Sequence, residues 1–257
     1  MPVKYEPDGQ IVVITIDRPE VANAIDRPTA DALVEAFGRY EADDDLAVAV
    51  LTGANGKFCA GADLKAMREG DPARVSRVEP DGDGPVGPTR MLLSKPVIAA
   101  VEGHAVAGGL ELAAWCDLRV AAEDAVFGVF CRRWGIPLMD GGTIRLARML
   151  GHSHALDLIL TGRGVSGEEA RRMGIANRLV SPGRAVEEAI SLARDIASHP
   201  QAALRSDRLS SYEQWSMALD GALAGEYRHG MTTLETGELV GGLDRYTSGG
   251  WRSGESA

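Results

Sequence analysis

The residue pattern best suited to chemistry is a pair of glycines followed closely by a glutamate, Gly108-Gly109-x-Glu111. It comes after the apolar run 97–101, which predicts a short buried strand, and before a helix expected over residues 110–116. The glycines allow a tight turn and leave room for a ligand beside the backbone. The first amides of such a helix have no internal partner, so they would stabilise an oxygen that gains negative charge. The same pattern also fits a glycine-packed helix start in which Glu111 only complements the helix dipole.

A second bend made of small residues lies upstream, in the segment KFCAGADL at residues 57–64. Here Ala60-Gly61-Ala62 precedes a helix expected to begin at about Asp63. Small side chains again leave backbone amides accessible. An ordinary tight turn with an aspartate N-cap would have the same sequence features. Each bend alone is therefore ambiguous, and the presence of a second one favours a functional over a purely structural interpretation of the first.

The elements that must position these bends alternate along the first part of the chain. Short β-branched or apolar runs predict strands, and amphipathic stretches between them predict helices. The expected strands are residues 10–17, 47–52, 97–101, 118–122 and 175–180, and the expected helices begin at Asp26, Asp63, residue 144, residue 151, Ser166 and residue 185. After about residue 180 the pattern is nearly all helical, through 201–229 in two pieces and 234–246, with a loose Gly/Ser-rich tail. This order predicts an α/β fold with buried sheets.

Composition narrows the class of protein and its partners. The chain has 257 residues and a formal net charge of −10, which argues against nucleic acid, including RNA, or an anionic membrane as the main partner. An anionic ligand would need a local basic pocket. The three cysteines form no CxxC pair, so we expect reduced thiols in a cytoplasmic protein and neither a disulfide framework nor a metal site. We see no targeting segment at the N-terminus and no apolar run long enough to span a bilayer.

Residues 68–90 differ in composition from the rest of the chain. They contain four prolines, four glycines and many charges, with little periodicity. We expect a mobile surface loop there, with one helical turn near residues 73–78. A long loop between two bends of this kind would border a ligand site, although simple disorder is an equal alternative.

Several segments together resemble the crotonase, or enoyl-CoA hydratase/isomerase, family. They are Asp17-Arg18-Pro19 with Asn23-Ala24, KFCAGADL, EGHAVAGGLELAAWCD, AVFGVF, GIPLMDGGTIRLARMLG and LTGRGVSGEEARRMGIANRLV. The resemblance extends over about residues 3–200, and the order and spacing of the segments carry it. It implies a spiral of ββα turns over residues 1–195, holding an acyl-CoA site, and a helical trimerisation region over residues 196–257. It also implies a homotrimer or a dimer of trimers, with a role in fatty acid metabolism.

The resemblance gives the two bends a joint meaning, because the family uses two backbone amides as an oxyanion hole for a thioester carbonyl. By motif position these are the amides of Ala62 and Gly108. Hydration, protonation or deprotonation of an enoyl thioester passes through an enolate-like state, whose charge builds on that oxygen. Loss of one such donor typically lowers the rate by about 10²–10³-fold.

The resemblance also places coenzyme A, which enters as part of the substrate, so no separate cofactor is expected. The adenine would meet main-chain groups of residues 60–64, the pantetheine arm would pass residues 21–24, and Arg18, Arg27 and Lys57 are candidates for the phosphates, unless they are ordinary surface charges. The implied binding residues are Arg18, Val21, Ala22, Ala24, Lys57, Ala60, Gly61, Ala62, Asp63 and Leu64.

The sequence departs from the hydratase pattern at one position. Family hydratases commonly use two glutamates; the first corresponds to Glu111, but Cys131 stands at the second. A thiol is mostly neutral and a weak hydrogen-bond partner, and a missing acid/base group typically lowers rates by about 10²–10⁴-fold. Asp140 is the candidate substitute, either as a partner of Glu111 in proton transfer or merely as a cap of the following helix. We therefore expect an enoyl-CoA hydratase or double-bond isomerase, with hydratase activity in doubt, or alternatively a non-catalytic acyl-CoA-binding homologue.

Overall fold

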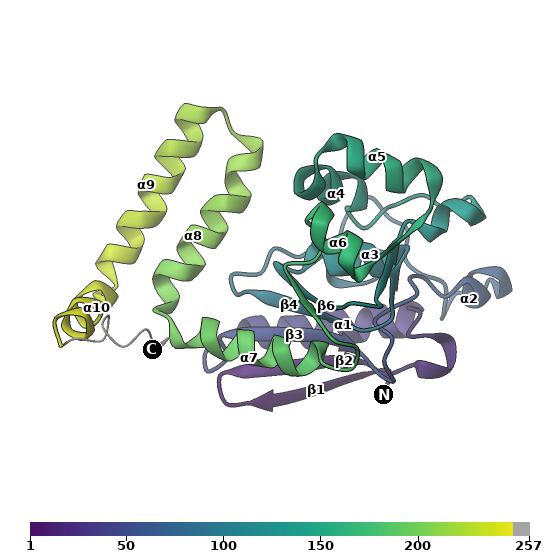
Figure 1. The fold of residues 1–257 in the computed structure, drawn as a ribbon, viewed down its shortest axis with the longest axis horizontal. Coiled ribbons are helices and arrows are strands. Elements are labelled where there is room, and N and C mark those ends of the chain that lie inside the picture. The colour runs from purple at the N-terminus through teal and green to yellow at the C-terminus, as the bar shows by residue number, and fades with distance from the viewer. Residues whose placement is uncertain (249–257) are drawn as a thin grey trace.

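The computed structural model describes residues 1–248, and its centre is a six-stranded sheet (Figure 1). The strands lie in the order β1-β2-β3-β4-β6-β9; β1 and β2 are antiparallel, and every later neighbouring pair is parallel. Their bounds are β1 Val3–Asp8, β2 Ile11–Ile16, β3 Val48–Gly53, β4 Val97–Val101, β6 Leu118–Ala122 and β9 Arg178–Val180. The β4 and β6 bounds match the expected strands, whereas β1 was not anticipated because its outer residues are mostly polar and exposed.

A second, three-stranded sheet joins the two bends to the rest of the molecule. It consists of β5 (His104–Val106), β7 (Val126–Gly128) and β8 (Gly164–Ser166), with β5 and β7 parallel. A single β-bridge between Cys59 and Ala105 attaches the first bend to β5. Strands of three residues are too short to show a periodic pattern, which is why the sequence did not predict them.

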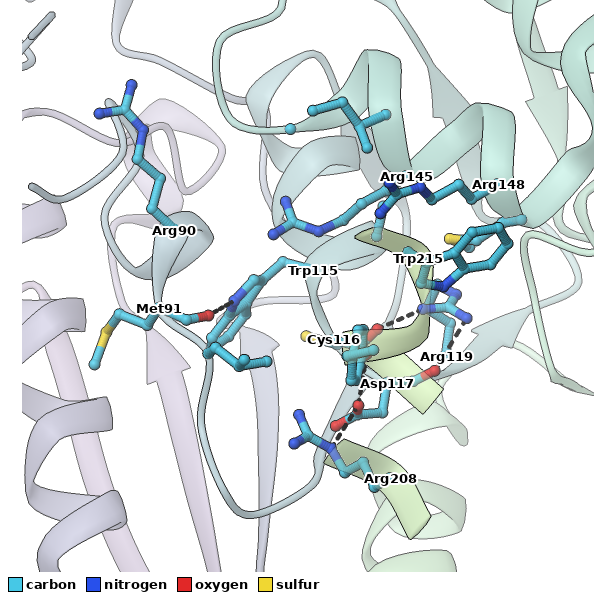
Figure 2. Close-up of a pocket in the computed structure, with 16 residues that line it drawn as sticks. Arg90, Met91, Trp115, Cys116, Asp117, Arg119, Arg145, Arg148, Arg208 and Trp215 are labelled. Atoms are coloured by element: carbon cyan, nitrogen blue, oxygen red, sulfur yellow. Dashed lines mark hydrogen bonds and ion pairs between the residues drawn. The ribbon is translucent and has the colours of Figure 1, made fainter. Parts of the chain in front are cut away.

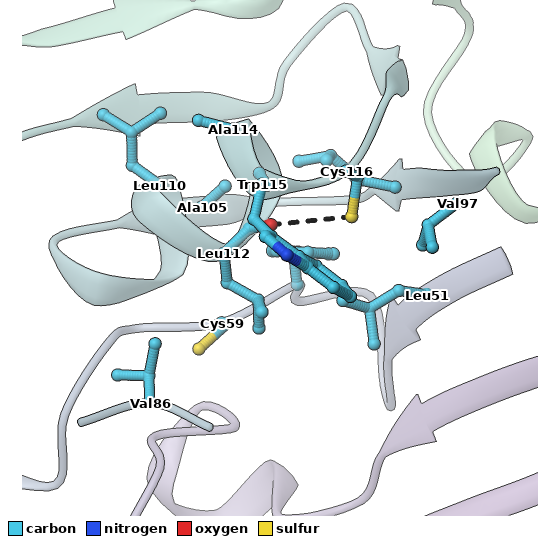
Figure 3. Packing of buried hydrophobic residues seen from close by; sticks show 14 of the residues in the cluster. Leu51, Cys59, Val86, Val97, Ala105, Leu110, Leu112, Ala114, Trp115 and Cys116 are labelled. Atoms are coloured by element: carbon cyan, nitrogen blue, oxygen red, sulfur yellow. Dashed lines mark hydrogen bonds between the residues drawn. The ribbon is translucent and has the colours of Figure 1, made fainter. Parts of the chain in front are cut away.

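The larger sheet is covered on both faces, as expected for parallel strands with near-continuous apolar sequences. One face packs against the amphipathic helix α7 (Ala185–Ser198) through Ala189, Leu192 and Ala193. The other face packs against α1 (Arg27–Ala42) and α3 (Gly108–Trp115), where Phe37 and Trp115 meet edge to face at 4.8 Å. Figure 3 shows this packing around α3.

The remaining helices follow the predicted order, with ends that differ by a few residues. They are α2 Leu64–Glu69, α4 Gly142–Leu150, α5 His152–Thr161, α6 Gly167–Met173, α8 Gln201–Glu213, α9 Leu219–Glu235 and α10 Glu238–Thr247. Short 3-10 turns occupy Pro19–Val21, Pro88–Arg90, Phe130–Trp134 and Gln214–Ser216. The predicted caps Asp26, Asp63 and Ser166 each accept backbone hydrogen bonds from the first turn of their helix.

Helices α8 and α9 form an antiparallel pair that stands away from the sheets (Figure 1). Arg208 on α8 is tied to the body by an ion pair with Asp117 at 2.8 Å. On α9 and α10 large apolar side chains are exposed, including Leu219, Tyr227 and Val240. No helix within residues 1–248 combines the length and the apolarity needed to cross a bilayer. A loose tail was predicted at the C-terminus, and from residue 249 onward it lies outside the described part of the chain.

Candidate active site

The two small-residue bends lie against each other. A Cβ built on Gly61 would be 2.8 Å from the backbone nitrogen of Gly108, and a Cβ built on Gly108 would be 3.6 Å from the nitrogen of Ala62. Helix α3 begins two residues earlier than expected, so Gly108 itself is its first residue. The observed fold therefore brings together two segments that are separated by more than 40 positions in sequence.

The amides of Ala62 and Gly108 border one cavity of about 310 Å³. Neither of these N–H groups donates a hydrogen bond to another group within residues 1–248. Unpaired backbone donors are rarely left facing a cavity unless water or a ligand satisfies them. These two amides are thus available to a ligand oxygen.

Glycine is required at this junction for steric reasons. A Cβ on Gly109 would lie 2.1 Å from the carbonyl oxygen of Cys59, which is backbone and cannot move aside. Gly61 has φ +93°, and Ala107, just before α3, adopts φ 54°, a conformation that is uncommon outside glycine. The close approach of the two bends depends on these conformations.

Glu111 lies in the first turn of α3 and is 3% exposed. Its Oε1 accepts hydrogen bonds from the backbone N–H groups of Asp140 and Gly142, each at 2.9 Å. Its Oε2 accepts none from the described residues and is not sealed from the cavity. Burial, and secondarily the charge of Asp140, raise the pKa of Glu111 to about 7, although the two amides oppose this shift. Glu111 is therefore poised to exchange a proton near neutral pH.

Asp140 lines the same cavity and does not cap α4, so the capping alternative is wrong. The N-cap residue of α4 is Gly141, and the Asp140 side chain accepts its hydrogen bonds from Val86 and Thr89 and not from the first turn of that helix. The Oδ1 atom of Asp140 accepts hydrogen bonds from the Val86 N–H at 3.1 Å and the Thr89 hydroxyl at 2.6 Å. Burial raises the pKa of Asp140, and these two donors oppose the rise. The backbone of Asp140 holds Glu111 while its side chain adds a second carboxyl to the cavity.

Cys131 also borders the cavity, in the 3-10 turn Phe130–Trp134. It is 5% exposed, and burial, followed by the charge of Glu111, raises the pKa of its thiol. A neutral thiol next to a carboxylate is a poor nucleophile and a poor proton carrier. Cys131 thus adds a small, neutral and weakly polar side chain to the cavity wall.

The other walls of the cavity are apolar. They include Leu64, Met67, Val78, Val86, Phe130, Trp134, Ile136 and Met139. Among residues 1–248, Glu111 and Asp140 are the only carboxyl groups on this lining, and no lysine or arginine belongs to it. Such a surface suits an uncharged aliphatic or aromatic chain.

The long loop was expected on the surface, but residues 84–89 are buried against the site. A hydrogen-bonded turn at residues 71–75 lies slightly earlier than the predicted helical turn, and the 3-10 turn at Pro88–Arg90 was not predicted. The sequence missed Val86 and Thr89 as site residues, since neither belongs to a periodic pattern. The only available signal was the loop's position between the two bends.

The two segments expected to meet coenzyme A run side by side. The Ala60 N–H donates to the Ala22 carbonyl at 3.1 Å, and the Ile25 N–H donates to the Gly61 carbonyl at 2.8 Å. Asn23, buried at φ 56°, fixes this arrangement by donating to the carbonyls of Ala54 and Lys57. Lys57 is exposed near this junction. Val21, Ala24, Asp63 and Leu64 belong to the same two segments.

Arg18 has a different environment from the one expected of a phosphate-binding residue. Its side chain is 12% exposed, and its guanidinium pairs with Asp26 and Asp63, each at 3.0 Å. Arg74 from the long loop pairs with the same two aspartates at 3.3 Å and 3.2 Å. This network ties the caps of α1 and α2 together and pairs the charge of Arg18 with two carboxylates; its predicted role at a coenzyme A phosphate stays a prediction.

A second cavity, of about 420 Å³, lies between α4 and α8 (Figure 2). Several arginines border it, but their guanidinium groups are engaged: Arg119 donates to the carbonyls of Ile175 and Cys116, and Arg145 donates to those of Asp140 and Thr89. Arg148 stacks on Trp215. The cavity contains none of the residues predicted for catalysis.

The fold and the residues of this cavity indicate an enzyme that acts on acyl thioesters, and comparison with known sequences shows its family. Residues 6–249 match the family described as enoyl-CoA hydratase/isomerase, and the chain belongs to that family. It is 39% identical over 214 residues to the enoyl-CoA hydratase EchA19 of Mycobacterium tuberculosis, covering 79% of each chain. It is 44% identical over 195 residues to the carnitinyl-CoA dehydratase of Salmonella arizonae, covering 74% of this chain and 72% of that protein.

Solved structures show the same fold over nearly the whole chain. The enoyl-CoA hydratase EchA1 from Mycobacterium marinum superimposes with a TM-score of 0.90 at 36% identity, covering 96% of each chain. An enoyl-CoA hydratase from Mycobacterium tuberculosis also gives a TM-score of 0.90, at 34% identity. The predicted crotonase fold is therefore confirmed.

Proposed function

We propose that this enzyme shifts the double bond of an enoyl-CoA through a thioester enolate, and that it hydrates such substrates poorly. The amides of Ala62 and Gly108 donate to the thioester oxygen, and Glu111 and Asp140 move the proton. The observation that carries the proposal is the convergence of two unpaired amides and two buried carboxyls on one cavity.

The two proton transfers of an isomerisation can be completed by these two carboxyl groups. In a 3-enoyl thioester, an ionised carboxylate removes a proton from C2, and the electron pair moves into an enolate stabilised by the amides. A protonated carboxyl then delivers a proton to C4, and the double bond moves to C2–C3. Like charges in one buried site disfavour double ionisation, so the pair holds one proton near neutral pH. Asp140 and Glu111 meet this requirement for one base and one acid.

Hydration places a further demand on the site, because a water must be held and polarised between two groups. Cys131 offers only a weak, neutral partner at the position where hydratases of the family carry the second glutamate. The shortage of a water-binding group favours isomerisation over hydration.

Substrate binding follows from the same geometry. The apolar cavity suits an uncharged acyl chain, and the segments 21–25 and 60–64 offer backbone groups to the coenzyme A portion, with Lys57 and Arg27 near its phosphates. Coenzyme A arrives with the substrate, and no separate cofactor is required. The exposed apolar side chains of α9 and α10 support self-association, for which the family suggests a homotrimer or a dimer of trimers. The free cysteines support a reducing, cytoplasmic compartment. The proposed role in fatty acid metabolism follows from the acyl-CoA substrate class of the family.

The direct test compares Glu111→Gln and Asp140→Asn with the unmodified enzyme on 3-enoyl-CoA and 2-enoyl-CoA substrates. Each substitution keeps the size of the side chain and removes its proton-transfer ability. We expect kcat for isomerisation to fall by about 10²–10⁴-fold in each variant. Wild-type turnover in both variants would remove the two carboxyls from the mechanism.

A second candidate function is acyl-CoA binding without turnover, and Cys131 at the position of a catalytic glutamate is the observation that favours it. Calorimetry with a saturated acyl-CoA, combined with turnover assays on a panel of chain lengths, separates the two functions. Tight binding without turnover of any enoyl-CoA would support the binding protein. Robust isomerisation that depends on Glu111 would exclude it.

A further inference from the structure

The two carboxyls of the site are held differently, and this difference points to a residue outside the predicted set. Glu111 is oriented by the backbone amides of Asp140 and Gly142, which remain when only the side chains of those residues are changed. Asp140 is oriented partly by a side chain, the hydroxyl of Thr89, whose Oγ1 lies 2.6 Å from Oδ1. Thr89 is 1% exposed and sits in the long loop, 51 positions before Asp140.

We infer that Thr89 is a positioning residue, which holds the Asp140 carboxylate through Oδ1 so that Oδ2 faces the substrate as the proton acceptor. This inference rests on the proposed isomerase function. Both hydrogen bonds to Asp140 end on Oδ1, and Oδ2 accepts none from the described residues. Oδ2 is also not sealed from the cavity, so it is the oxygen that a substrate proton can reach.

Arg145 holds the loop that carries Thr89 against the segment that carries Asp140. Arg145 on α4 donates to the carbonyl of Asp140 at 2.8 Å and to the carbonyl of Thr89 at 2.6 Å. One guanidinium thus fixes the backbone of both partners of the Thr89–Asp140 hydrogen bond. Arg145 is half-buried, and its bridge holds the backbone of Thr89 close to the backbone of Asp140.

A hydroxyl that donates to a carboxylate stabilises its ionised form. The groups that face Asp140 from neighbouring elements are the Glu111 carboxyl, the Arg90 and Arg145 guanidinium groups and the Cys59 thiol. The arginines favour the ionised form of Asp140, while burial and the nearby carboxyl oppose it. The Thr89 hydroxyl, like the arginines, favours the ionised form of Asp140. Asp140 is therefore the member of the pair that ionises first, and Glu111 retains the shared proton.

Two substitutions of nearly matched size isolate the hydroxyl. Thr89→Val replaces the hydroxyl by a methyl group, and Thr89→Ser keeps the hydroxyl while losing the methyl. We expect isomerisation by Thr89→Val to fall about 10-fold at neutral pH, the size typical of losing one hydrogen bond to a charged group. We expect the acidic limb of its pH–kcat profile to move to higher pH, and Thr89→Ser to keep the wild-type profile. Thr89→Ala serves in place of Thr89→Val if the valine variant does not fold.

The pKa of Asp140 itself supplies a readout that does not depend on turnover. Carbon-13 NMR of the carboxyl carbons in the ligand-free protein, assigned with Asp140→Asn, should show a higher pKa in Thr89→Val and an unchanged one in Thr89→Ser. An Asp140 titration that is the same in Thr89→Val and the wild type would overturn the inference, whatever the activity. Failure of the proposed function shows separately, as wild-type turnover in Glu111→Gln and Asp140→Asn.

Discussion

The active site has two halves that are built in different ways. One half, formed by the bends at residues 60–62 and 107–109, offers backbone amides and depends on side chains that are small or absent. The other half, formed by Glu111, Asp140 and Cys131, depends on which side chains are present and how they are buried. The first half is therefore sensitive to added volume, and the second to changes in charge or hydrogen bonding.

The largest effect is expected from adding one methyl group to the backbone half. In Gly109→Ala the new Cβ would lie 2.1 Å from the Cys59 carbonyl oxygen, so the two bends must separate. We expect a loss of folded protein, or otherwise a fall in kcat of about 10²–10³-fold as the amide pair loses its geometry. Thermal unfolding and isomerisation assays measure both outcomes.

Gly38→Ala is the matched control, since Gly38 lies in α1 and a Cβ there would meet nothing within 4 Å. That substitution should stabilise the helix by roughly 0.5–1 kcal/mol and leave kcat unchanged. Equal behaviour of the two alanine variants would contradict the steric account of the bends.

The second prediction concerns the pH dependence of the side-chain half. The base must be ionised and the acid protonated, so activity is lost below the pKa of Asp140 and above that of Glu111. With the pKa of Glu111 at about 7, kcat should decline as the pH rises through neutrality. The apparent values belong to the coupled pair.

Glu111→Gln provides the control, because it should remove the decline on the alkaline side from whatever activity is left. A pH–kcat profile that keeps its alkaline limb in this variant would assign that limb to another group. Stopped-time assays between pH 5 and 9 cover the alkaline limb, which is expected near the Glu111 pKa of about 7.

A smaller effect is expected from a substitution that adds a carboxyl group to the side-chain half of the site. Cys131→Glu places a carboxyl where hydratases of the family carry one, beside the cavity and near Glu111. We expect hydration of a 2-enoyl-CoA to rise by about 10-fold or more relative to isomerisation, since a second group can then hold the water. Cys131→Gln has the same size but cannot ionise, and it should show little of this gain. A ratio of hydration to isomerisation that is unchanged in Cys131→Glu would separate the thiol from the choice of reaction.

Many of the helices and strands could be predicted from short windows of the sequence. The runs at 97–101 and 118–122 correspond to β4 and β6, and Asp26, Asp63 and Ser166 cap the helices they were expected to begin. These features depend on residues close together in the chain, whose alternation or capping chemistry is visible in a short window. The three-residue strands β5, β7 and β8 were missed because their pairing, and not their composition, defines them.

Sequence alone determined that two small-residue bends and Glu111 were present, and the family resemblance suggested what they do. Only the tertiary structure decided that the two bends touch and that Asp140 accepts a hydrogen bond from Thr89 instead of capping α4. It also decided that Arg18 forms ion pairs with two aspartates. The physical reason is distance along the chain: Thr89 and Asp140 are 51 residues apart, and Arg18 and Asp63 are 45 apart. Hydrogen bonds and ion pairs of that range leave no local pattern, and they form only when the packed sheets bring their segments together.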